Sequence, residues 1–302
     1  MTNLEIKKLL FEFKDNLKIN HDIKKKNWFN IGGKAKLYFK AENLKELKNF
    51  IKKIKDKEKI FVLGAGSNTL FTDGIFDGVV IKLSKNFNNI SKLSEEIIIA
   101  GSAVTDKALS EYAMENNLSG FEFLSCIPGT IGGGIKMNAG CYGSEFKDIL
   151  LSVQAINRNG QIITIPANKI LFQYRNNNLS NDLIFLSASF KGIKSNKIDI
   201  QSLMKKYKNQ KEISQPTKIR TSGSTFKNPI AQTDKKVWEL IKESVPLNTS
   251  FGDAMISDKH CNFFVNKGSA SFKDMKNLIE FVSNKVLENT GITIETEIKI
   301  IE

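Results

Sequence analysis

Two glycine-rich segments contain the residues best suited to hold a ligand through backbone groups. The first covers residues 64–70 (GAGSNTL) and directly follows the apolar run IFVL. Glycine lets the backbone approach a phosphate closely and turns successive N–H groups toward an anion. A Rossmann dinucleotide site needs a third glycine and then a helix, whereas this chain has Thr69 and leads toward another strand. The segment therefore predicts either a diphosphate-binding turn of another kind, with Ser67 and Asn68 as hydrogen-bonding side chains, or a plain turn between strands.

The second segment, residues 127–143 (IPGTIGGGIKMNAGCYG), has six glycines within the fifteen positions 129–143. Each ordered glycine loses more chain entropy than another residue would, so this density is expected where something needs close backbone approach. A flat or phosphorylated ligand has that need and solvent does not. Cys141 has no evident base or cation beside it in the sequence, which predicts a small packed residue rather than a nucleophile.

Two further segments have weaker patterns. Residues 30–33 (NIGG) follow Trp28 and Phe29, and they fit a simple turn or an apolar wall beside a ring. Residues 221–229 (TSGSTFKNP) offer hydroxyls, a cation and an amide within one turn. This composition suits an anionic substrate as well as it suits a solvated loop.

Histidine and cysteine are too scarce to support most other kinds of site. The chain has two histidines, His21 and His260, and three widely spaced cysteines without a C-x-x-C pair. A metal site, a zinc ribbon and a disulfide framework are therefore not expected, and the odd cysteine count suits a reducing, cytoplasmic setting. If the protein is an enzyme, its chemistry rests on Arg, Glu, hydroxyl groups or a bound cofactor.

Composition places the chain among ordinary globular proteins. Its length suggests about two domains, and no apolar run reaches the ~18–20 residues that a membrane span needs. The first residues, MTNLEIKKLLFEFKDN, contain acidic residues and no cleavage site, so they predict a short amphipathic helix rather than a secretory signal. The net charge of +13 comes from scattered lysines. That scatter disfavours nucleic acid as a partner and leaves open a basic cleft for a small phosphorylated ligand.

The elements that must position these residues mix helices with strands, without an internal repeat. Periodicity predicts helices over 41–57, 105–117, 195–215, 232–243 and 271–289, with caps at Thr105 and Ser271. Apolar runs predict strands over 60–64, 78–83, 97–104 and 183–193, a hairpin over 151–166 and an alternating strand over 292–301. The mixture indicates an α+β fold in at least two modules, with a boundary near residue 195.

Taken in this order, the segments resemble the UDP-N-acetylenolpyruvoylglucosamine reductases (UDP-N-acetylmuramate dehydrogenases, MurB). The matching signatures are NWFNIGGKA, VLGAGSNTLF, IPGTIGGGIKMNAGCYG, YRNNN, GSTFKNP, DKHCNFFVN and IETEIKII. They extend from near residue 20 to the end of the chain. Its length is similar to that of the shorter class in the family, which lacks an extra tyrosine-bearing loop over the substrate. Thr296 stands where the family often has proline.

The resemblance implies a two-subdomain FAD-binding domain (PCMH-type) over residues 1–195, divided into 1–72 and 73–195. A substrate-binding domain over 196–290 follows, and a terminal strand, 291–302, returns to the first subdomain. FAD is implied as the bound cofactor and NADPH as the co-substrate that reduces it. The implied FAD contacts are Gly64, Ala65, Gly66, Ser67, Asn68, Leu70, Pro128, Gly129, Thr130, Gly132, Gly133, Asn138, Ala139, Gly140 and Gly143.

The resemblance also implies the reaction. Hydride from reduced FAD adds to the methylene carbon of the enolpyruvyl ether of UDP-N-acetylglucosamine, giving UDP-N-acetylmuramate for peptidoglycan synthesis and so for cell-wall biogenesis, cell shape and cell division. Electron density develops on the α-carbon and the carboxyl oxygens, where a cation stabilises it. Arg175 matches the catalytic arginine of the family, Ser224 matches its proton donor to the α-carbon, and Glu297 matches its glutamate.

Several assignments stay open in the sequence. By strand alternation Glu295 shares a face with Glu297, and only the motif favours Glu297. Lys227 and Asn228 are candidates for binding the diphosphate or the carboxylate of the substrate, and Tyr142 for a contact near flavin and substrate. No role is assigned to His260.

Two other functions compete with the reductase. A flavoprotein oxidase or dehydrogenase of another alcohol or carbohydrate would share only the FAD-binding domain. A basic nucleic-acid-binding protein would be colourless, and its binding would weaken steeply with salt. For the reductase, the implied partners are the UDP-sugar and NADPH, with a monomer in the cytoplasm and no nucleic acid, membrane insertion or metal.

Overall fold

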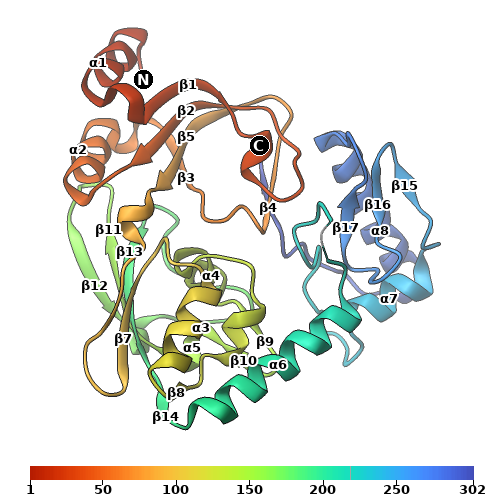
Figure 1. Cartoon of the computed structure of the whole chain (residues 1–302). Coiled ribbons are helices and arrows are strands. Elements are labelled where there is room, and N and C mark those ends of the chain that lie inside the picture. The colour runs from red at the N-terminus through yellow and green to blue at the C-terminus, as the bar shows by residue number, and fades with distance from the viewer. Residues whose placement is uncertain (218) are drawn as a thin grey trace. The chain divides into compact units, whose positions relative to one another are not determined.

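The computed structural model of the chain describes residues 1–217 and 219–302, and it mixes helices with strands from end to end (Figure 1). The α-helices are α1 (Asn3–Phe13), α2 (Leu44–Ile54), α3 (Asp106–Glu115), α4 (Ile131–Met137), α5 (Phe146–Ile149), α6 (Lys197–Ser214), α7 (Val237–Ser244) and α8 (Phe272–Thr290). The 3-10 helices are η1 (Lys14–Asn16), η2 (Lys24–Lys26), η3 (Lys55–Lys57), η4 (Lys85–Phe87), η5 (Glu122–Cys126) and η6 (Ala167–Lys169). The strands are β1 (Leu17–Asp22), β2 (Lys34–Ala41), β3 (Lys59–Val62), β4 (Thr69–Phe71), β5 (Ile75–Leu83), β6 (Ile90–Lys92), β7 (Ile97–Gly101), β8 (Leu118–Ser119), β9 (Gly140–Cys141), β10 (Ser144–Glu145), β11 (Leu150–Ile156), β12 (Ile162–Pro166), β13 (Ile184–Lys191), β14 (Ile193–Lys194), β15 (Ser250–Phe251), β16 (Ala254–Ile256), β17 (Phe264–Asn266) and β18 (Lys299–Ile301). Among these described elements, no helix has the length and apolar character needed to cross a membrane.

The chain forms two compact units, and each is assembled from three separate stretches. Unit 1 comprises Met1–Ile19, Lys36–Ala65 and Asp77–Gln210. Unit 2 comprises Asn20–Ala35, Gly66–Phe76 and Lys211–Glu302. The borders fall inside β1, β2, β5 and α6 and in the loop after β3. The units therefore do not follow one another along the sequence, and the functional boundaries at residues 72, 195 and 290 stay a prediction.

Unit 1 contains an antiparallel five-stranded sheet in the order β12-β11-β13-β7-β6. The predicted hairpin is confirmed as β11 and β12, and its turn contains Gly160 at a φ of 72°, which glycine adopts freely. Helices α3, α4 and α5 lie beside this sheet (Figure 1). The rings of Phe121 and Phe146 contact Phe190 of β13 in edge-to-face arrangements, an aromatic cluster that fixes the helices on the sheet.

A second sheet has the order β1-β2-β5-β3, and helix α2 buries its apolar face in the same core. The predicted face of α2 is confirmed for Leu47, Ile51 and Ile54, which are buried. Leu44 in the first turn is 37% exposed, because the helix begins there and has no preceding turn to cover it. Phe50, also on α2, stacks on Phe39 of β2 with the ring centres 3.8 Å apart.

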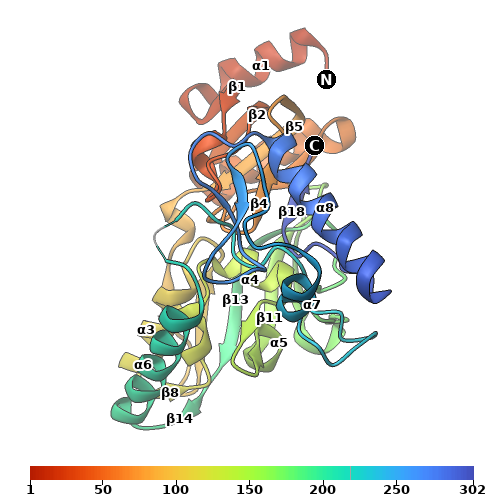
Figure 2. The same cartoon turned by 90° about the vertical axis from the view of Figure 1, so that its right-hand side faces the viewer.

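Unit 2 is built around α8 and the three-stranded antiparallel sheet β15-β16-β17, with α7 packed in the same core (Figure 2 shows both helices). The Asp274 N–H donates to Ser271 Oγ while the Asp274 carboxylate accepts from the Ser271 N–H, so the predicted cap of α8 is confirmed. Gly291 ends the helix at a φ of 70°. The residues predicted to point inward are buried: Met275, Leu278, Ile279, Val282 and Val286.

The last strand is shorter than predicted. Residues 299–301 form β18, which pairs in parallel with β4. Upstream, Thr296 forms an isolated bridge with Phe226, and the Glu297 N–H donates to the Thr225 carbonyl at 2.7 Å. The alternation runs through residues 292–301 as expected, but the segment changes partners along its length, so only its end is a ladder.

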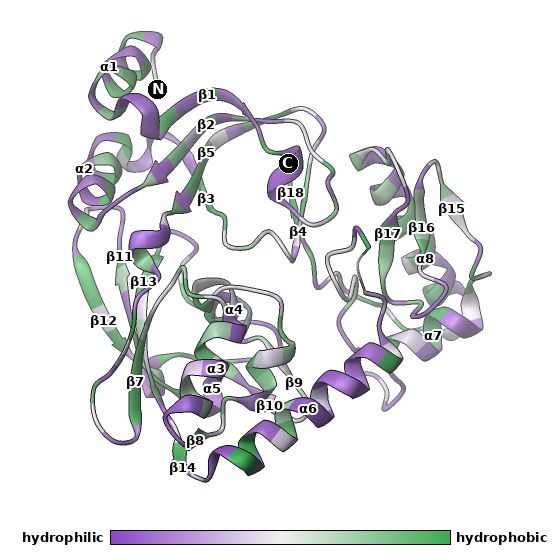
Figure 3. Ribbon diagram, in the orientation of Figure 1, coloured by the Kyte–Doolittle hydropathy of each residue, from purple (hydrophilic) through white to green (hydrophobic). Residues whose placement is uncertain are grey.

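The sequence predicts helix α6 clearly, but it does not predict the elements found in residues 127–143. Helix α6 is confirmed, and it is mostly polar (Figure 3), with Ile200 as its one buried residue. Residues 127–143 have no clear period, yet they contain α4 and the short strand β9, and β10 follows directly after them. Three of the seven residues of α4 are glycine, so its stability comes from tertiary contacts rather than from helix propensity.

We expect Ser271→Ala to lower the free energy of unfolding by about 1 kcal/mol, because the Asp274 N–H then lacks its acceptor at the start of α8. Ser269→Ala is the matched control, since Ser269 is exposed and precedes the helix. Its effect should stay below ~0.5 kcal/mol. Urea unfolding followed by circular dichroism measures both variants, and equal losses would contradict the capping role.

Candidate active site

The predicted anion-binding loop, residues 64–68, leaves the end of β3. In the described part of the chain, the backbone N–H groups of residues 65–68 donate no hydrogen bond to a protein atom. Lys82 of β5 donates from Nζ to the Gly64 carbonyl, which brings a positive charge beside the start of the loop. Unbonded N–H groups in a glycine-containing turn suit an anion. The loop therefore fits a diphosphate.

Gly64, the first residue of this loop, packs against Thr130 of the second glycine-rich segment within unit 1. A Cβ on Gly64 would lie 2.6 Å from Thr130 Oγ1, closer than real Cβ contacts. Thr130 precedes α4 and forms a bridge with Thr105, which caps α3. Two segments that lie far apart in the sequence thus touch at Gly64 and Thr130.

Protein atoms, rather than a ligand, account for several glycines of the second segment. A Cβ on Gly129 would lie 2.4 Å from Asp106 Oδ2, and a Cβ on Gly134 would lie 2.3 Å from the Phe146 ring. At Gly132 the Cβ of Ser102 would be 3.1 Å away. The sequence argument that a ligand demands the glycines is therefore too simple at these positions.

Gly133 and Gly143 are different, because a side chain has room there. The nearest atom to a Cβ on Gly133 is Thr130 Oγ1 at 3.6 Å, and Gly133 is exposed. Nothing lies within 4 Å of a Cβ on Gly143, although its φ of 85° favours glycine. These two positions are where a bound ligand would explain the absence of a side chain.

Two polar groups packed against this segment lack partners. Ser102 Oγ and both carboxyl oxygens of Asp106 are buried without a hydrogen bond among the described residues. Burial raises the pKa of Asp106 well above its usual value, which favours the protonated acid. Buried polar groups are normally bonded, so unpartnered ones indicate a missing ligand or water. Within unit 1, these groups fit one part of a large polar cofactor such as FAD.

Arg175 follows Tyr174 in a loop of unit 1. Its backbone has a φ of 58°, and its Nη2 donates to the Gly140 carbonyl at 3.0 Å. The guanidinium lies 4.9 Å from the centre of the Tyr174 ring, and its Nη1 is 4.0 Å from Glu145 Oε1. The arginine is therefore oriented by several groups of its own unit.

Tyr142 is held on the linker helix. Its φ is 54°, its ring stacks on Tyr207 of α6 with centres 4.3 Å apart, and its hydroxyl donates to the Tyr207 carbonyl at 2.9 Å. Burial raises the pKa of Tyr142 to about 12, so the phenol stays neutral. The residue remains 36% exposed and can still contact a ligand.

Other predicted FAD contacts have surroundings of different kinds. Asn138 is fully buried, with its amide and its carbonyl oxygen bonded inside unit 1, so its contacts do not support a FAD contact. Leu70 is fully buried in β4 opposite Ile300. Ala139 packs against the core under α4, while Pro128 is exposed.

Ser224 and Glu297 lie on adjoining backbone segments of unit 2. Ser224 bridges to Phe263, and the next residue, Thr225, accepts from the Glu297 N–H. Among the described residues, none forms a hydrogen bond with the Ser224 hydroxyl. Asn68 Nδ2 donates to the Glu297 carbonyl at 3.2 Å. The terminal motif is thus fixed to the end of the predicted anion-binding loop.

Glu295 and Glu297 differ in their surroundings. Glu295 has a 75% exposed side chain that pairs with Lys227 at 3.1 Å, whereas Glu297 is half-buried. This difference supports the motif-based choice of Glu297. Asn228 Oδ1 accepts from the Val237 N–H and so fixes the start of α7.

Sequence reasoning assigned no role to two residues of this region, Asn262 and Lys299. Asn262 is buried and bonds to both the N–H and the carbonyl of Phe226, which fixes the segment that carries Ser224. The pKa of Lys299 is lowered by burial and by the nearby Lys227. Strand alternation from Glu297 is a signal that could have found Lys299. Asn262 stands in the DKHCNFFVN motif, but its role could not be assigned from the sequence because its partners come from another segment. His260 is a packed histidine whose Nδ1 accepts from the Asn262 N–H.

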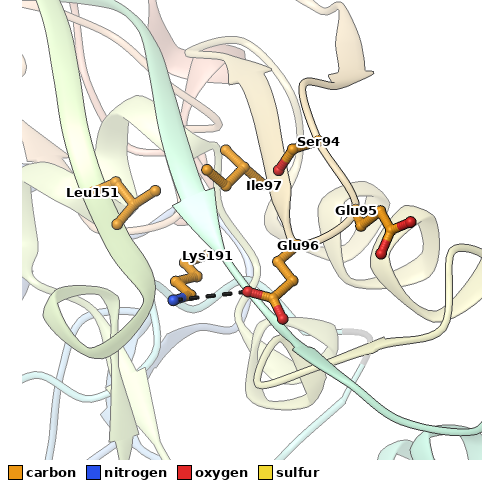
Figure 4. Close-up of a pocket in the computed structure, with 6 residues that line it drawn as sticks. All are labelled: Ser94, Glu95, Glu96, Ile97, Leu151 and Lys191. Carbon is orange, nitrogen blue, oxygen red and sulfur yellow. Dashed lines mark ion pairs between the residues drawn. The ribbon is translucent and has the colours of Figure 1, made fainter.

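The structure thus groups the predicted residues by unit. Unit 1 contains Arg175, Tyr142 and residues 127–143, while unit 2 contains Ser224, Glu297, Lys227 and Asn228. A surface pocket at the β6–β7 turn contains none of them (Figure 4). Its Lys191 pairs with Glu96 at 3.7 Å, and this exposed pair offers no site chemistry.

Comparisons with known proteins agree with this arrangement. The family model of the C-terminal domain of UDP-N-acetylenolpyruvoylglucosamine reductase matches residues 215–301, and the FAD binding domain model matches residues 35–166. A Pelagibacter ubique (strain HTCC1062) protein named UDP-N-acetylenolpyruvoylglucosamine reductase is 62% identical over 298 residues, 99% of each chain. A Rickettsia conorii protein of the same name is 44% identical, covering 95% of this chain and 96% of its own. The crystal structure of the MurB reductase from Thermus caldophilus matches with a TM-score of 0.81 and 28% identity, over 95% of this chain and 100% of that chain.

Gly133 and Gly134 separate ligand contact from packing. We expect Gly134→Ala to destabilise the apoprotein by about 1–3 kcal/mol, because its methyl group overlaps the Phe146 ring. Gly133→Ala should leave apoprotein stability unchanged and weaken FAD binding by about tenfold or more. Thermal unfolding and flavin-fluorescence titration of apoprotein measure the two effects. Unaltered FAD binding in Gly133→Ala would remove this face of the segment from the cofactor site.

Asp106 gives a pH dependence of definite sign. Its pKa is raised in the folded protein, so the stability it provides is fully present below its unfolded pKa of about 4 and decreases as pH rises toward the folded pKa. We expect Asp106→Asn to make the unfolding free energy of the apoprotein less dependent on pH above ~4. Urea unfolding at a series of pH values tests this. An unchanged slope would contradict a protonated, buried Asp106.

Proposed function

The chain belongs to the family of UDP-N-acetylenolpyruvoylglucosamine reductases, and on that premise we propose that it reduces the enolpyruvyl ether of UDP-N-acetylglucosamine to the lactyl ether of UDP-N-acetylmuramate. It is an oxidoreductase of peptidoglycan precursor synthesis that contains FAD and uses NADPH as co-substrate. The single observation that carries the proposal is the full-length similarity to the Pelagibacter reductase. The match of residues 215–301 to the reductase C-terminal domain disfavours an oxidase that shares only the FAD-binding domain.

Residues on the loops of both glycine-rich segments would hold the cofactor. The free N–H groups of residues 65–68 suit its diphosphate, and the face of α4 at Gly133 has room for a flat group. Once bound, FAD supplies the two-electron chemistry that links NADPH to the UDP-sugar. The side chains of this protein then bind the substrate, stabilise charge and deliver a proton.

Arg175 is proposed to stabilise the charge that forms on the substrate. Addition of hydride to the methylene carbon places electron density on the α-carbon and on the carboxyl oxygens. A guanidinium presents two N–H donors in one plane, which matches a carboxylate. Arg175 is already oriented through Gly140 and Tyr174, so it loses little freedom when a substrate binds.

Ser224 is proposed to protonate the α-carbon. The bond from its hydroxyl hydrogen to Oγ breaks, a C–H bond forms, and the serine regains a proton from solvent. A serine is a weak acid, but a carbanion-like enolate is basic enough to accept its proton. The absence of any hydrogen bond from the described residues leaves this hydroxyl available for a substrate. Glu297, on the adjoining segment, would share a proton with the substrate carboxyl group.

Lys227 and Asn228 are proposed to bind the diphosphate or the carboxylate, and Tyr142 to contact the substrate near the flavin. Lys227 is paired with the exposed Glu295, an interaction that is worth little in water and is easily exchanged for an anionic ligand. We further propose a cytoplasmic enzyme that acts as a monomer. Size-exclusion chromatography at micromolar concentration tests the monomer, and a dimer would contradict it.

Anaerobic spectroscopy tests the function. We expect purified protein to be yellow, NADPH to bleach it, and the enolpyruvyl UDP-sugar to restore the colour without oxygen. Ser224→Ala should bleach at the normal rate and recover its colour about 10²–10⁴-fold more slowly, since only the second half-reaction needs the proton. Ser250→Ala, at an exposed serine of β15, is the control. Recovery at the normal rate in Ser224→Ala would remove this residue from the mechanism, and oxygen consumption with an alcohol would favour an oxidase.

A further inference from the structure

The side chain of Arg175 is held by the short hairpin of β9 and β10. Gly140 and Glu145 are register partners in this hairpin. Nη2 of Arg175 donates to the Gly140 carbonyl at 3.0 Å, and Nη1 lies 4.0 Å from Glu145 Oε1. Two nitrogens of one planar group thus face two members of one strand pair. This arrangement fixes the plane of the guanidinium as well as its position.

The carboxylate of Glu145 is itself fixed through its other oxygen. Oε2 accepts from Asn138 Nδ2 at 3.0 Å and pairs with Lys147 Nζ at 2.8 Å. The Glu145 N–H donates to Asp148 Oδ2 at 2.8 Å. The hydrogen bond and ion pair with the Glu145 carboxylate raise the pKa of Lys147. Because Lys147 already compensates the carboxylate, Glu145 can orient Arg175 without cancelling its positive charge toward a ligand.

Asn138 connects this carboxylate to the backbone that carries the arginine. It ends α4 in a left-handed conformation with a φ of 41°, and it is fully buried. Its Nδ2 also donates to the Gln173 carbonyl at 3.2 Å, two residues before Arg175, while its Oδ1 accepts from the Lys147 N–H at 3.0 Å. One side chain therefore joins the end of α4, the hairpin and the arginine loop.

The backbone of Arg175 gives an independent reason for this support. A φ of 58° is unfavourable for a residue with a Cβ and persists only where the surroundings hold it. Such strain is concentrated at sites where a side chain must be placed accurately. Gln173 and Asn176 exchange backbone hydrogen bonds across the turn that contains Arg175, and the hairpin contacts and the bond from Asn138 to Gln173 add to this support.

We propose that Glu145, held by Asn138, is a positioning residue that sets the orientation of the Arg175 guanidinium for the carboxylate of the substrate. The proposal rests on the proposed function, in which Arg175 stabilises charge during transfer to the UDP-sugar. It extends that function to two residues that act through Arg175 and its loop.

The test separates the two half-reactions of the FAD-loaded enzyme. In Glu145→Gln, we expect bleaching by NADPH within about twofold of the unmodified enzyme and recovery with the enolpyruvyl UDP-sugar about 10–100-fold slower, since a misplaced charge affects only the second step. Glu96→Gln is the matched control, because Glu96 also pairs with a lysine in unit 1 (Figure 4). In an Arg175→Lys background, Glu145→Gln should cause no further loss.

Two results would overturn the positioning role. Recovery in Glu145→Gln at the rate of Glu96→Gln would show that Arg175 needs no support from the hairpin. An equal slowing of both half-reactions would indicate a general loss of the flavin site instead. If NADPH bleaches the unmodified enzyme but the UDP-sugar never restores its colour, the proposed function is wrong. The positioning role of Glu145 is then tested by a second measurement.

That second measurement needs no substrate. The chain has three arginines, Arg158, Arg175 and Arg220. The NMR signal of the Arg175 side-chain Nε–H is therefore assigned as the one that disappears in Arg175→Lys. We expect the Arg175 Nε–H of the FAD-loaded protein to exchange with water about tenfold faster in Glu145→Gln, because the guanidinium is less restrained. Exchange as slow as in the unmodified protein would overturn the inference.

Discussion

Side chains packed so closely against glycines that no Cβ fits there are the constraint on which unit 1 depends. Gly129 lies against the Asp106 carboxyl group and Gly134 against the Phe146 ring, at distances that exclude a Cβ. Because the segment is packed by protein atoms, it keeps its shape before any ligand arrives. Asp106, which packs against this segment, keeps a buried carboxyl group without a hydrogen-bond partner among the described residues.

The second feature of unit 1 is the planar guanidinium of Arg175, in a chain whose cations are mostly lysines. The chain has 45 basic residues and only three of them are arginines, so arginine occurs where lysine would not serve. At Arg175 one guanidinium nitrogen donates to the Gly140 carbonyl and another lies 4.0 Å from Glu145, an arrangement in one plane that the compact ammonium group of lysine does not reproduce. The same planarity is what a carboxylate substrate would use.

In unit 2, the last residues of the chain bond to two segments that lie far away in the sequence. The segment of Thr225 accepts from Glu297, and the Asn68 side chain donates to the Glu297 carbonyl, so three distant parts of the sequence meet at one glutamate. Asn262 fixes the first of these parts through two hydrogen bonds to Phe226. The terminal segment therefore links two segments that are distant in the sequence, because it bonds to a different partner on each side of Glu297.

The sequence by itself determined most helices and strands, the caps at Thr105 and Ser271, the family and its FAD, because periodicity, capping residues and motifs are local patterns. It located the glycine-rich segments but gave the wrong reason for Gly129, Gly132 and Gly134, since the colliding atoms belong to residues elsewhere in the chain. The alternation places Glu295 and Glu297 on one face and only the motif chose Glu297, whereas the burial of their side chains differs only after folding. Only the tertiary structure decided these points, together with the support of Arg175 by Glu145 and Asn138. Hydrogen bonds and close contacts between segments depend on distances in space, and the order of residues does not encode them locally.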